Sequence, residues 1–151
     1  MKVFLTGATG FVGHHVAQAL AAEGADLRLL VRKSSNLANL EGIPGDTHLG
    51  DLARPELLAP ALAGCDAVVH VAADYRLWIP DPAAMYRANV DGTRDLLRLA
   101  REAGVSRFVY TSSVATMHFR TDGIVINEDT PVSLADMVEM CIRDRFITAT
   151  L

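Results

Sequence analysis

Three glycines spaced three residues apart separate a short apolar run from a helical stretch near the N-terminus, and this feature constrains the fold most strongly. The run Lys2–Thr6 predicts a buried strand, and the glycines follow at once in Thr6-Gly-Ala-Thr-Gly-Phe-Val-Gly13. Residues Phe11 to Glu23 predict a helix that Gly24 ends. Four residues of this helix share one apolar stripe: Val12, Val16, Ala19 and Leu20. A strand, a glycine turn and a helix in this order are typical of α/β proteins with parallel sheets.

The alternation of short β-branched runs with helical stretches continues along the rest of the chain. Further strands are predicted at four places: Leu27–Arg32, Thr47–Leu49, Ala67–Val71 and Arg107–Thr111. Helices are predicted over about Pro55–Ala63 and Pro82–Ala103, and Gly104 ends the second. That helix carries a stripe of six residues: Met85, Asn89, Gly92, Leu96, Leu99 and Ala103. The repeated order predicts right-handed crossovers and a doubly wound parallel sheet of the α/β class.

The composition favours one globular domain and excludes several classes of function. The chain has 151 residues, of which 50% are hydrophobic and 21% charged. Its net charge of -4 provides no basic surface, so neither nucleic acid nor an anionic membrane is an expected partner. No apolar stretch approaches the roughly 20 residues that span a bilayer. Cys65 and Cys141 have neither metal-ligand nor disulfide spacing, so a cytoplasmic location is expected.

Each glycine of the turn has a predicted task in holding a dinucleotide. Gly7 permits the tight turn, Gly10 lets a pyrophosphate approach the backbone, and Gly13 lets the helix pack closely. The free N–H groups near Phe11 and Val12 would face the phosphates with the helix dipole behind them. A glycine turn that binds nothing is the alternative. A mononucleotide P-loop is excluded, because neither Lys-Ser nor Lys-Thr follows the glycines.

The end of the predicted second strand bears on which dinucleotide is held. An NAD site usually has Asp or Glu there to bind the ribose 2′-hydroxyl. This chain has Arg32 and Lys33 instead, and a guanidinium suits a 2′-phosphate. NADP is therefore predicted over NAD, with two solvated basic residues as the alternative.

Five motifs, read together, resemble one known family. They are Thr6–Gly13, Gly50-Asp-Leu52, His70-Val-Ala-Ala73, Arg87-Ala-Asn-Val-Asp-Gly-Thr93 and Tyr110-Thr-Ser-Ser113. From Met1 to about Met137 the chain resembles the N-terminal part of an extended short-chain dehydrogenase/reductase, in the NAD-dependent epimerase/dehydratase family. Val71–Pro82 is more narrowly similar to hopanoid-associated sugar epimerases, which are close to the dihydroflavonol-4-reductase-like enzymes. The resemblance implies a Rossmann fold.

The resemblance gives roles to the matching positions around the cofactor. It implies that Asp51 accepts a hydrogen bond from the adenine amine and that Leu52 packs on the adenine ring. For Asp51, a cap for the helix after Pro55 is the alternative. Small side chains at Ala72 and Ala73 would let the ribose and phosphates pass, and close packing accounts for them equally well. The expected cofactor contacts are Gly7, Thr9, Gly10, Phe11, Val12, Gly13, Arg32, Lys33, Asp51, Leu52, Ala72 and Ala73.

Two matching positions carry expected catalytic roles. Ser113 follows a predicted strand at its carboxyl end, where open α/β sheets bind ligands. The resemblance implies that its hydroxyl bonds the substrate oxygen, and a turn serine is the alternative. Asn89 lies on an apolar helix stripe, so its amide must be hydrogen-bonded. The resemblance implies a proton relay with a catalytic Lys; a structural amide that satisfies a strand carbonyl is the alternative, and both roles are compatible.

Aromatic, basic and histidine side chains are the remaining candidates for substrate or metal binding. Tyr75, Arg76 and Trp78 are expected to line the substrate pocket, with a loop anchored by hydrophobic contacts as the alternative. Four histidines have no partner at metal-ligand spacing: His14, His15, His70 and His118. The adjacent pair is expected on the surface or in the packing of the first helix, because neighbouring helical positions face different ways. No metal site is expected.

The family's catalytic Tyr-x-x-x-Lys pair is absent from this sequence. In the family the Tyr moves a proton, and the Lys four residues later lowers its pKa. None of the tyrosines, Tyr75, Tyr86 and Tyr110, has Lys at that spacing, and no Lys follows Lys33. Residues 1–137 are therefore expected to form an incomplete dinucleotide-binding domain without catalytic activity of its own.

The resemblance ends after Met137, and residues 138–151 are expected to be a non-native tail. Met140-Cys-Ile-Arg-Asp-Arg145 resembles translated sequencing adapter, which indicates a truncated gene model.

The sequence predicts the cofactor-binding part of an NAD(P)-dependent sugar-nucleotide epimerase or carbonyl reductase. Its expected partners are NADP, or NAD, and a small-molecule substrate, with no nucleic acid and no membrane span; a homodimer is left open for the complete parent. The first alternative is a non-enzymatic NADP-binding sensor of the atypical short-chain dehydrogenase type. The second is a structural interaction domain that binds no cofactor.

Overall fold

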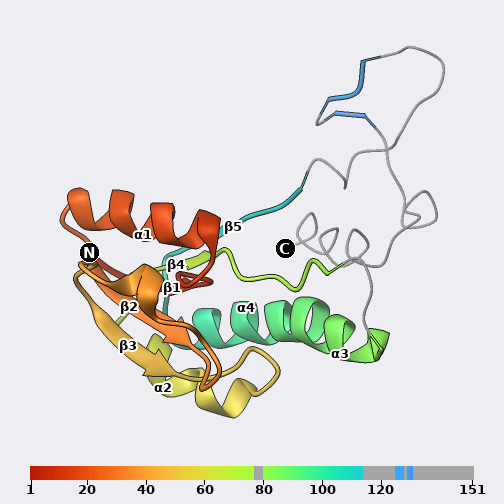
Figure 1. Ribbon diagram of the computed structural model, residues 1–151, viewed down its shortest axis with the longest axis horizontal. Helices are drawn as coiled ribbons and strands as arrows, with labels where there is room; N and C mark the ends of the chain where they lie inside the picture. Colours follow the sequence, from red (N-terminus) through yellow and green to blue (C-terminus); the bar gives the residue numbers. More distant parts are fainter. Residues whose placement is uncertain (77–79, 114–124, 128, 131–151) are drawn as a thin grey trace.

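Five parallel strands form the sheet of the computed structural model, which describes residues 1–76, 80–113, 125–127, 129 and 130 (Figure 1). The strands are β1 (Lys2–Thr6), β2 (Asp26–Val31), β3 (Asp46–Leu49), β4 (Ala67–His70) and β5 (Arg107–Tyr110). Their order is β3-β2-β1-β4-β5, and every neighbouring pair is parallel. The central strand β1 pairs on both sides, with Val3 opposite Leu27 and Ala67. The doubly wound parallel sheet predicted from the sequence is confirmed.

Helices cover both faces of this sheet, as Figure 1 shows. The helix α1 (Phe11–Ala22) lies on one face, and α2 (Ala59–Leu62) and α4 (Gly92–Glu102) lie on the other. Before α4 come α3 (Pro82–Tyr86) and a π-helical segment, Arg87–Asp91. Short 3-10 turns occur at Ala38–Leu40 and Pro55–Leu57. Within the described part of the chain, no helix combines the length and the apolar character that crossing a bilayer requires.

Two apolar cores lie on opposite faces of the sheet because side chains alternate along each strand. Val3 and Leu5 point to the α1 side, where they join Ala17. Phe4 points to the opposite side and joins Leu96 of α4. All three of these β1 side chains have no exposed surface. Burial on both faces explains why β1 is apolar without alternation.

The first helix is rotated relative to the stripe predicted from its apolar residues. Gly13 and Ala17 are its buried positions, with Val16 and Leu20 partly buried beside them. The prediction was wrong for Val12, which is 52% exposed, and for Ala19, which is also exposed. The physical reason is Gly13, where the helix meets the glycine turn so closely that this face must point inward.

Two further helix predictions require correction. The predicted helix Pro55–Ala63 is divided into the 3-10 turn and α2, because Pro60 has no N–H to continue the hydrogen-bond ladder. In the long helix Ala103 is exposed, since α4 ends one residue earlier and the chain turns there towards β5. Ala100 takes the buried position instead.

Candidate functional site

The predicted site residues meet at one edge of the sheet. Gly7 follows β1, Arg32 follows β2, and Ala72 comes two residues after β4. Asp51 and Ser113 come two and three residues after β3 and β5. Because all five strands are parallel, these positions share the carboxyl edge, where open α/β sheets bind ligands.

Two of the three turn glycines are required by contacts inside the protein. Gly7 has a φ of 82°, and a Cβ there would lie 2.7 Å from the backbone N of Ala72. A Cβ on Gly13 would lie 2.0 Å from the carbonyl oxygen of Gly7, so the helix packs directly on the turn. At Gly10 a Cβ would meet only that same oxygen, at 3.3 Å, and Gly10 is exposed. Packing within the described residues therefore does not account for this glycine, which agrees with a ligand approaching its backbone.

The first turn of α1 presents free donors to this edge. Gly10 is the N-cap, no side chain caps the helix, and no acidic residue lies in the first turn. The N–H of His14 is the one that bonds back to the Gly10 carbonyl, at 2.9 Å, so the three N–H groups before it have no helical acceptor. The positive end of the helix dipole, about half an elementary charge, reinforces them. The apolar side chain of Phe11 is 79% exposed beside these donors.

The basic residues predicted to read the 2′-position lie directly after β2. Arg32 and Lys33 are both exposed. Their loop is shaped by the Arg32 N–H, which donates to Ser35 Oγ at 3.0 Å, and by the Ser35 N–H, which donates to the Arg32 carbonyl at 2.9 Å. Since Leu30 is opposite Thr6 in the register, this loop begins next to the glycine turn.

Asn39 fastens that basic loop to the glycine turn, a contact that the sequence did not reveal. Its side-chain amide donates to the Thr9 carbonyl at 2.8 Å. Its own carbonyl accepts from Nδ1 of His14 at 2.6 Å. His14 therefore has a packing role, as expected, while His15 is exposed and its ring meets Phe11 edge-on. The described residues contain no group of three potential metal ligands.

The two residues assigned to adenine lie in a turn after β3. Asp51 Oδ1 accepts from the N–H of Ala53 at 2.9 Å. The alternative of a helix cap at Asp51 is wrong, because the N-cap of the following 3-10 turn is Arg54. Leu52 is half-buried, and Gly92 of α4 packs closely against it.

The side chain of Asn89 makes two hydrogen bonds with the backbone of Asp74. The side chain is 5% exposed and lies in the π-helical segment. Its Nδ2 donates to the Asp74 carbonyl, and its Oδ1 accepts the Asp74 N–H, both at 2.7 Å. A structural amide is therefore present, but the predicted strand carbonyl is wrong as its partner, because Asp74 lies in the loop after β4. The two bonds fix the segment that begins with the half-buried Ala72 and Ala73. The proton-relay role stays a prediction.

Asp74 and Arg76 form an ion pair that sequence reasoning missed. Arg76 Nε donates to Asp74 Oδ1 at 2.8 Å, and the second guanidinium nitrogen contacts the other carboxylate oxygen. The hydrogen bonds from Arg76 hold the pKa of Asp74 below its usual value, against the smaller opposing effect of burial. The charge of Arg32 lowers this pKa further, although less than Arg76 does.

Of the remaining predicted residues, some are described by the structure and others are not. Ser113 is half-buried after β5, and Ser112 is exposed. Tyr75 is 78% exposed on the loop after β4. Trp78, His118 and Cys141 lie outside the described residues, as does the predicted tail 138–151.

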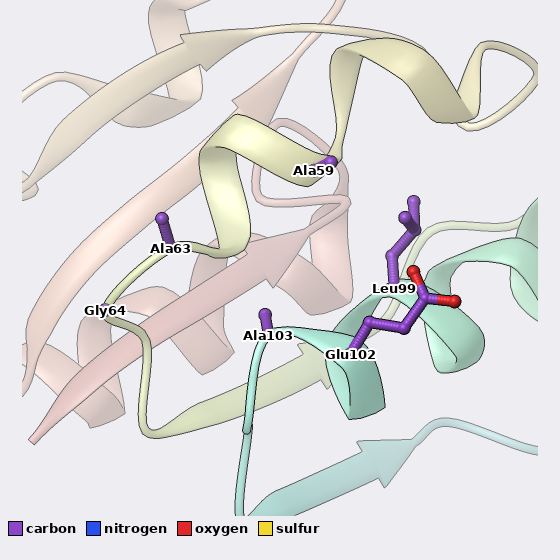
Figure 2. A pocket seen from close by; sticks show the side chains of 6 residues that line it. All are labelled: Ala59, Ala63, Gly64, Leu99, Glu102 and Ala103. Carbon is purple, nitrogen blue, oxygen red and sulfur yellow. The ribbon is translucent and has the colours of Figure 1, made fainter.

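A separate depression lies at the opposite edge of the sheet, between α2 and the end of α4 (Figure 2). It encloses about 430 Å³ and is lined by Ala59, Ala63, Gly64, Leu99, Glu102 and Ala103. Glu102 supplies its charge and is already paired with Arg98 at 3.0 Å. Small side chains and one neutralised carboxylate offer no chemistry that would compete with the carboxyl edge as the functional site.

The sheet order, the helices on both faces and the glycine turn define a Rossmann-type α/β protein. Residues 3–135 match the model of the NAD dependent epimerase/dehydratase family, and the chain belongs to this family.

Individual relatives agree with this assignment. A protein of Synechocystis sp. described as "Putative dihydroflavonol 4-reductase" is 47% identical over 120 residues, which are 80% of this chain and 35% of that protein. The crystal structure of gox2253 has a TM-score of 0.88 and 47% identity, covering 95% of this chain and 44% of that one. A short-chain dehydrogenase/reductase superfamily protein from Agrobacterium tumefaciens, solved with bound NAD, has a TM-score of 0.80 and 31% identity, covering 97% and 42%. The chain thus spans about a third of the length of the curated relatives it matches.

Proposed function

We propose that this chain binds NADP(H) in preference to NAD(H) across the carboxyl edge of its sheet. The observation that carries the proposal is the uncapped start of α1 at Gly10, where three backbone donors have no helical acceptor and packing within the described residues does not require the missing Cβ. A pyrophosphate supplies the acceptors and negative charge that such a helix start favours. The residues present therefore fit a dinucleotide.

The preference for NADP rests on the charge beside β2. Arg32 and Lys33 stand where an NAD site usually has a carboxylate. Both side chains are exposed, so a 2′-phosphate can reach them without breaking a buried contact. The Asp74 carboxylate is neutralised by Arg76 and therefore repels a phosphate less than a free carboxylate would.

We propose that the complete parent is an oxidoreductase or epimerase acting on a carbonyl compound or a sugar nucleotide. The relatives include a ketoreductase from Stigmatella aurantiaca. They also include a protein of Escherichia coli O157:H7 described as "N-acetyl-alpha-D-glucosaminyl-diphospho-ditrans,octacis-undecaprenol 4-epimerase". A bound nicotinamide supplies hydride transfer. In this proposal the Ser113 hydroxyl bonds the reacting oxygen, and Asn89 holds the Asp74 backbone that borders the site. A hopanoid-associated sugar substrate is the narrower form of the proposal, supported by Val71–Pro82.

A second proposed function, kept as the alternative, is an NADP-binding sensor. The proton donor that the chemistry needs is not among the 151 residues at the family's spacing. We therefore propose that this chain binds the cofactor but does not turn a substrate over. A native continuation of the gene that contains the pair favours the enzyme, and a continuation that lacks it favours the sensor.

Separate calorimetric titrations with NADPH and with NADH test the proposed function. NADPH is expected to bind more tightly, and Arg32→Ala is expected to reduce that difference by about tenfold or more, because a charge-assisted bond is worth about 1.5–3 kcal/mol. Arg94→Ala is the matched control, since Arg94 pairs with Asp91 on the exposed side of α4. Tighter binding of NADH would contradict the NADP preference. A folded chain that binds neither dinucleotide would refute the proposal as a whole.

A further inference from the structure

A buried chain of hydrogen bonds runs through His70 at the carboxyl end of β4. His70 Nδ1 lies 2.6 Å from Thr6 Oγ1, and His70 Nε2 lies 2.9 Å from Thr93 Oγ1. All three residues are at most 1% exposed. Thr6 and His70 are direct neighbours in the parallel register, so both side chains point to the face that α4 covers. The chain of bonds therefore joins β1, β4 and α4.

One end of this chain reaches the glycine turn. Thr6 Oγ1 also accepts the N–H of Ala72, at 3.2 Å. Ala72 is the residue whose backbone N would lie 2.7 Å from a Cβ on Gly7. Thr6 thus holds the backbone after β4 against the first glycine of the turn.

His70 also contacts the strand that leads to Ser113. Its carbonyl accepts the N–H of Thr111 at 3.0 Å. Its ring stacks on that of Tyr110, with centroids 5.3 Å apart and planes at 28°. The buried His70 therefore contacts Thr6, which holds the glycine turn, and also Tyr110 and Thr111, which lead to Ser113.

Both bonds of the ring allow either tautomer, because each threonine hydroxyl can donate or accept. In the direction that we infer, Thr6 Oγ1 accepts from Ala72 and donates its own proton to His70 Nδ1, and His70 Nε2–H donates to Thr93 Oγ1.

We propose that Thr6 and His70 are positioning residues that hold the glycine turn and the Ser113 end of β5 at a fixed position relative to each other. This inference rests on the proposed dinucleotide function and adds two residues that act on the cofactor through the backbone. Without the Thr6 hydroxyl, the Ala72 N–H loses its acceptor, and the segment after β4 relaxes away from Gly7. The measured Kd then rises as the competent fraction of molecules falls.

Four variants of the 151-residue chain test the proposal, with NADPH as the probe. Thr6→Val keeps the shape and removes the hydroxyl, and we expect it to raise the Kd about tenfold, the effect of leaving the half-buried Ala72 N–H without its acceptor. Thr6→Ser restores the hydroxyl and is expected to restore affinity. His70→Gln loses the atom at the Nδ1 position, whereas His70→Asn retains one there, so the smaller Asn variant is expected to bind more tightly than the Gln variant. A role limited to filling space predicts the reverse order.

Val3→Ala is the matched control for lost stability. Val3 is fully buried at the other end of β1, so its truncation lowers the melting temperature without touching the hydrogen-bond chain. Its Kd for NADPH is expected to stay within about twofold of the wild-type value. A Kd that follows the melting temperature across all five variants would overturn the positioning role.

Nitrogen-15 NMR of the wild-type histidine rings gives a readout that does not depend on any variant folding. We expect His70 to carry its proton on Nε2; a proton on Nδ1 would overturn the inferred bonding direction and with it the role of His70 as the acceptor of the Thr6 hydroxyl proton. A wild-type chain that binds NADPH while all four variants bind equally would overturn the positioning role and leave the proposed function standing. A wild-type chain without affinity for either dinucleotide would overturn both.

Discussion

Alanine substitutions at Gly10 and at Gly13 test whether the two glycines have different roles. We expect Gly13 to matter for the stability of the fold and Gly10 for the affinity for NADPH. An alanine in a helix is normally about 0.5–1 kcal/mol more favourable than glycine. At Gly13, however, the new Cβ would lie 2.0 Å from the Gly7 carbonyl oxygen, where real contacts do not fall below 3.0 Å. The Gly13 and Gly7 backbones must then move apart by about 1 Å, and such overpacking costs about 1–3 kcal/mol.

The clash at Gly13 outweighs the gain in helix propensity. We expect Gly13→Ala to lower the free energy of unfolding by about 2 kcal/mol, or the melting temperature by about 4–8 °C. At Gly10 the Cβ would meet one atom at 3.3 Å, and the backbone there is extended, with φ of -87° and ψ of 171°. Gly10→Ala is therefore expected to cost less than about 1 kcal/mol, the loss from an alanine at an N-cap.

Binding should respond in the opposite order to stability. The Cβ of Gly10→Ala occupies the space through which a pyrophosphate would reach the first turn of α1, so we expect at least a tenfold weaker affinity for NADPH. Urea unfolding followed by circular dichroism gives the stabilities, and calorimetry gives the affinities. A folded Gly10→Ala chain that binds NADPH like the wild type would refute the reasoning, as would a Gly13→Ala chain as stable as Gly10→Ala.

Further predictions concern charge, the buried amide and the gene. Arg32→Asp is expected to invert the cofactor preference towards NAD, because a carboxylate accepts from the ribose 2′-hydroxyl and repels a 2′-phosphate; the two Kd values decide it. Asn89→Leu leaves the Asp74 N–H and carbonyl without their partner and should cost about 2–3 kcal/mol in urea unfolding, and a loss under 0.5 kcal/mol would speak against the clamp. The pKa of Asp74 is lowered in the fold, so its contribution to stability is present above about pH 3.8 and lost as the pH falls through the folded-state value; Arg76→Gln should bring that pKa back up in an NMR titration, and an unchanged pKa would contradict the assigned cause. Sequencing the source locus past the codon for Met137 should give a reading frame different from residues 138–151, and the same frame would disprove the non-native tail.

The sheet could be predicted from the sequence because parallel strands covered on both faces leave a plain pattern. Short apolar runs such as Lys2–Thr6 and Ala67–Val71 alternate with helical stretches, and the structure places strands within one residue of these predicted ends. The rotation of α1 could not be predicted in this way. Its buried face is set by Gly13, a residue without a side chain, whereas the apolar pattern of the sequence runs through the larger Val12.

The glycine turn was predictable because its geometry depends on the backbone. Spacing alone points to Gly7, Gly10 and Gly13, and the structure excludes a Cβ at two of them: Gly7 has a positive φ, and Gly13 packs directly on the Gly7 carbonyl. Asn39 and the contact between Asp74 and Asn89 were missed, since Asn39 bonds a backbone carbonyl 30 residues away and the Asp74 backbone bonds a side chain 15 residues away. Long-range bonds of this kind leave no periodic trace in a sequence.

The measurement that tests the central claim most directly is the change in backbone amide NMR shifts when NADPH is added to the 151-residue chain. The account predicts that the largest changes fall on the amides of Gly10 to Gly13 and of Arg32, with little change along the exposed side of α4. Saturating NADPH that leaves the amides of Gly10 to Gly13 unmoved would contradict a dinucleotide site at this turn.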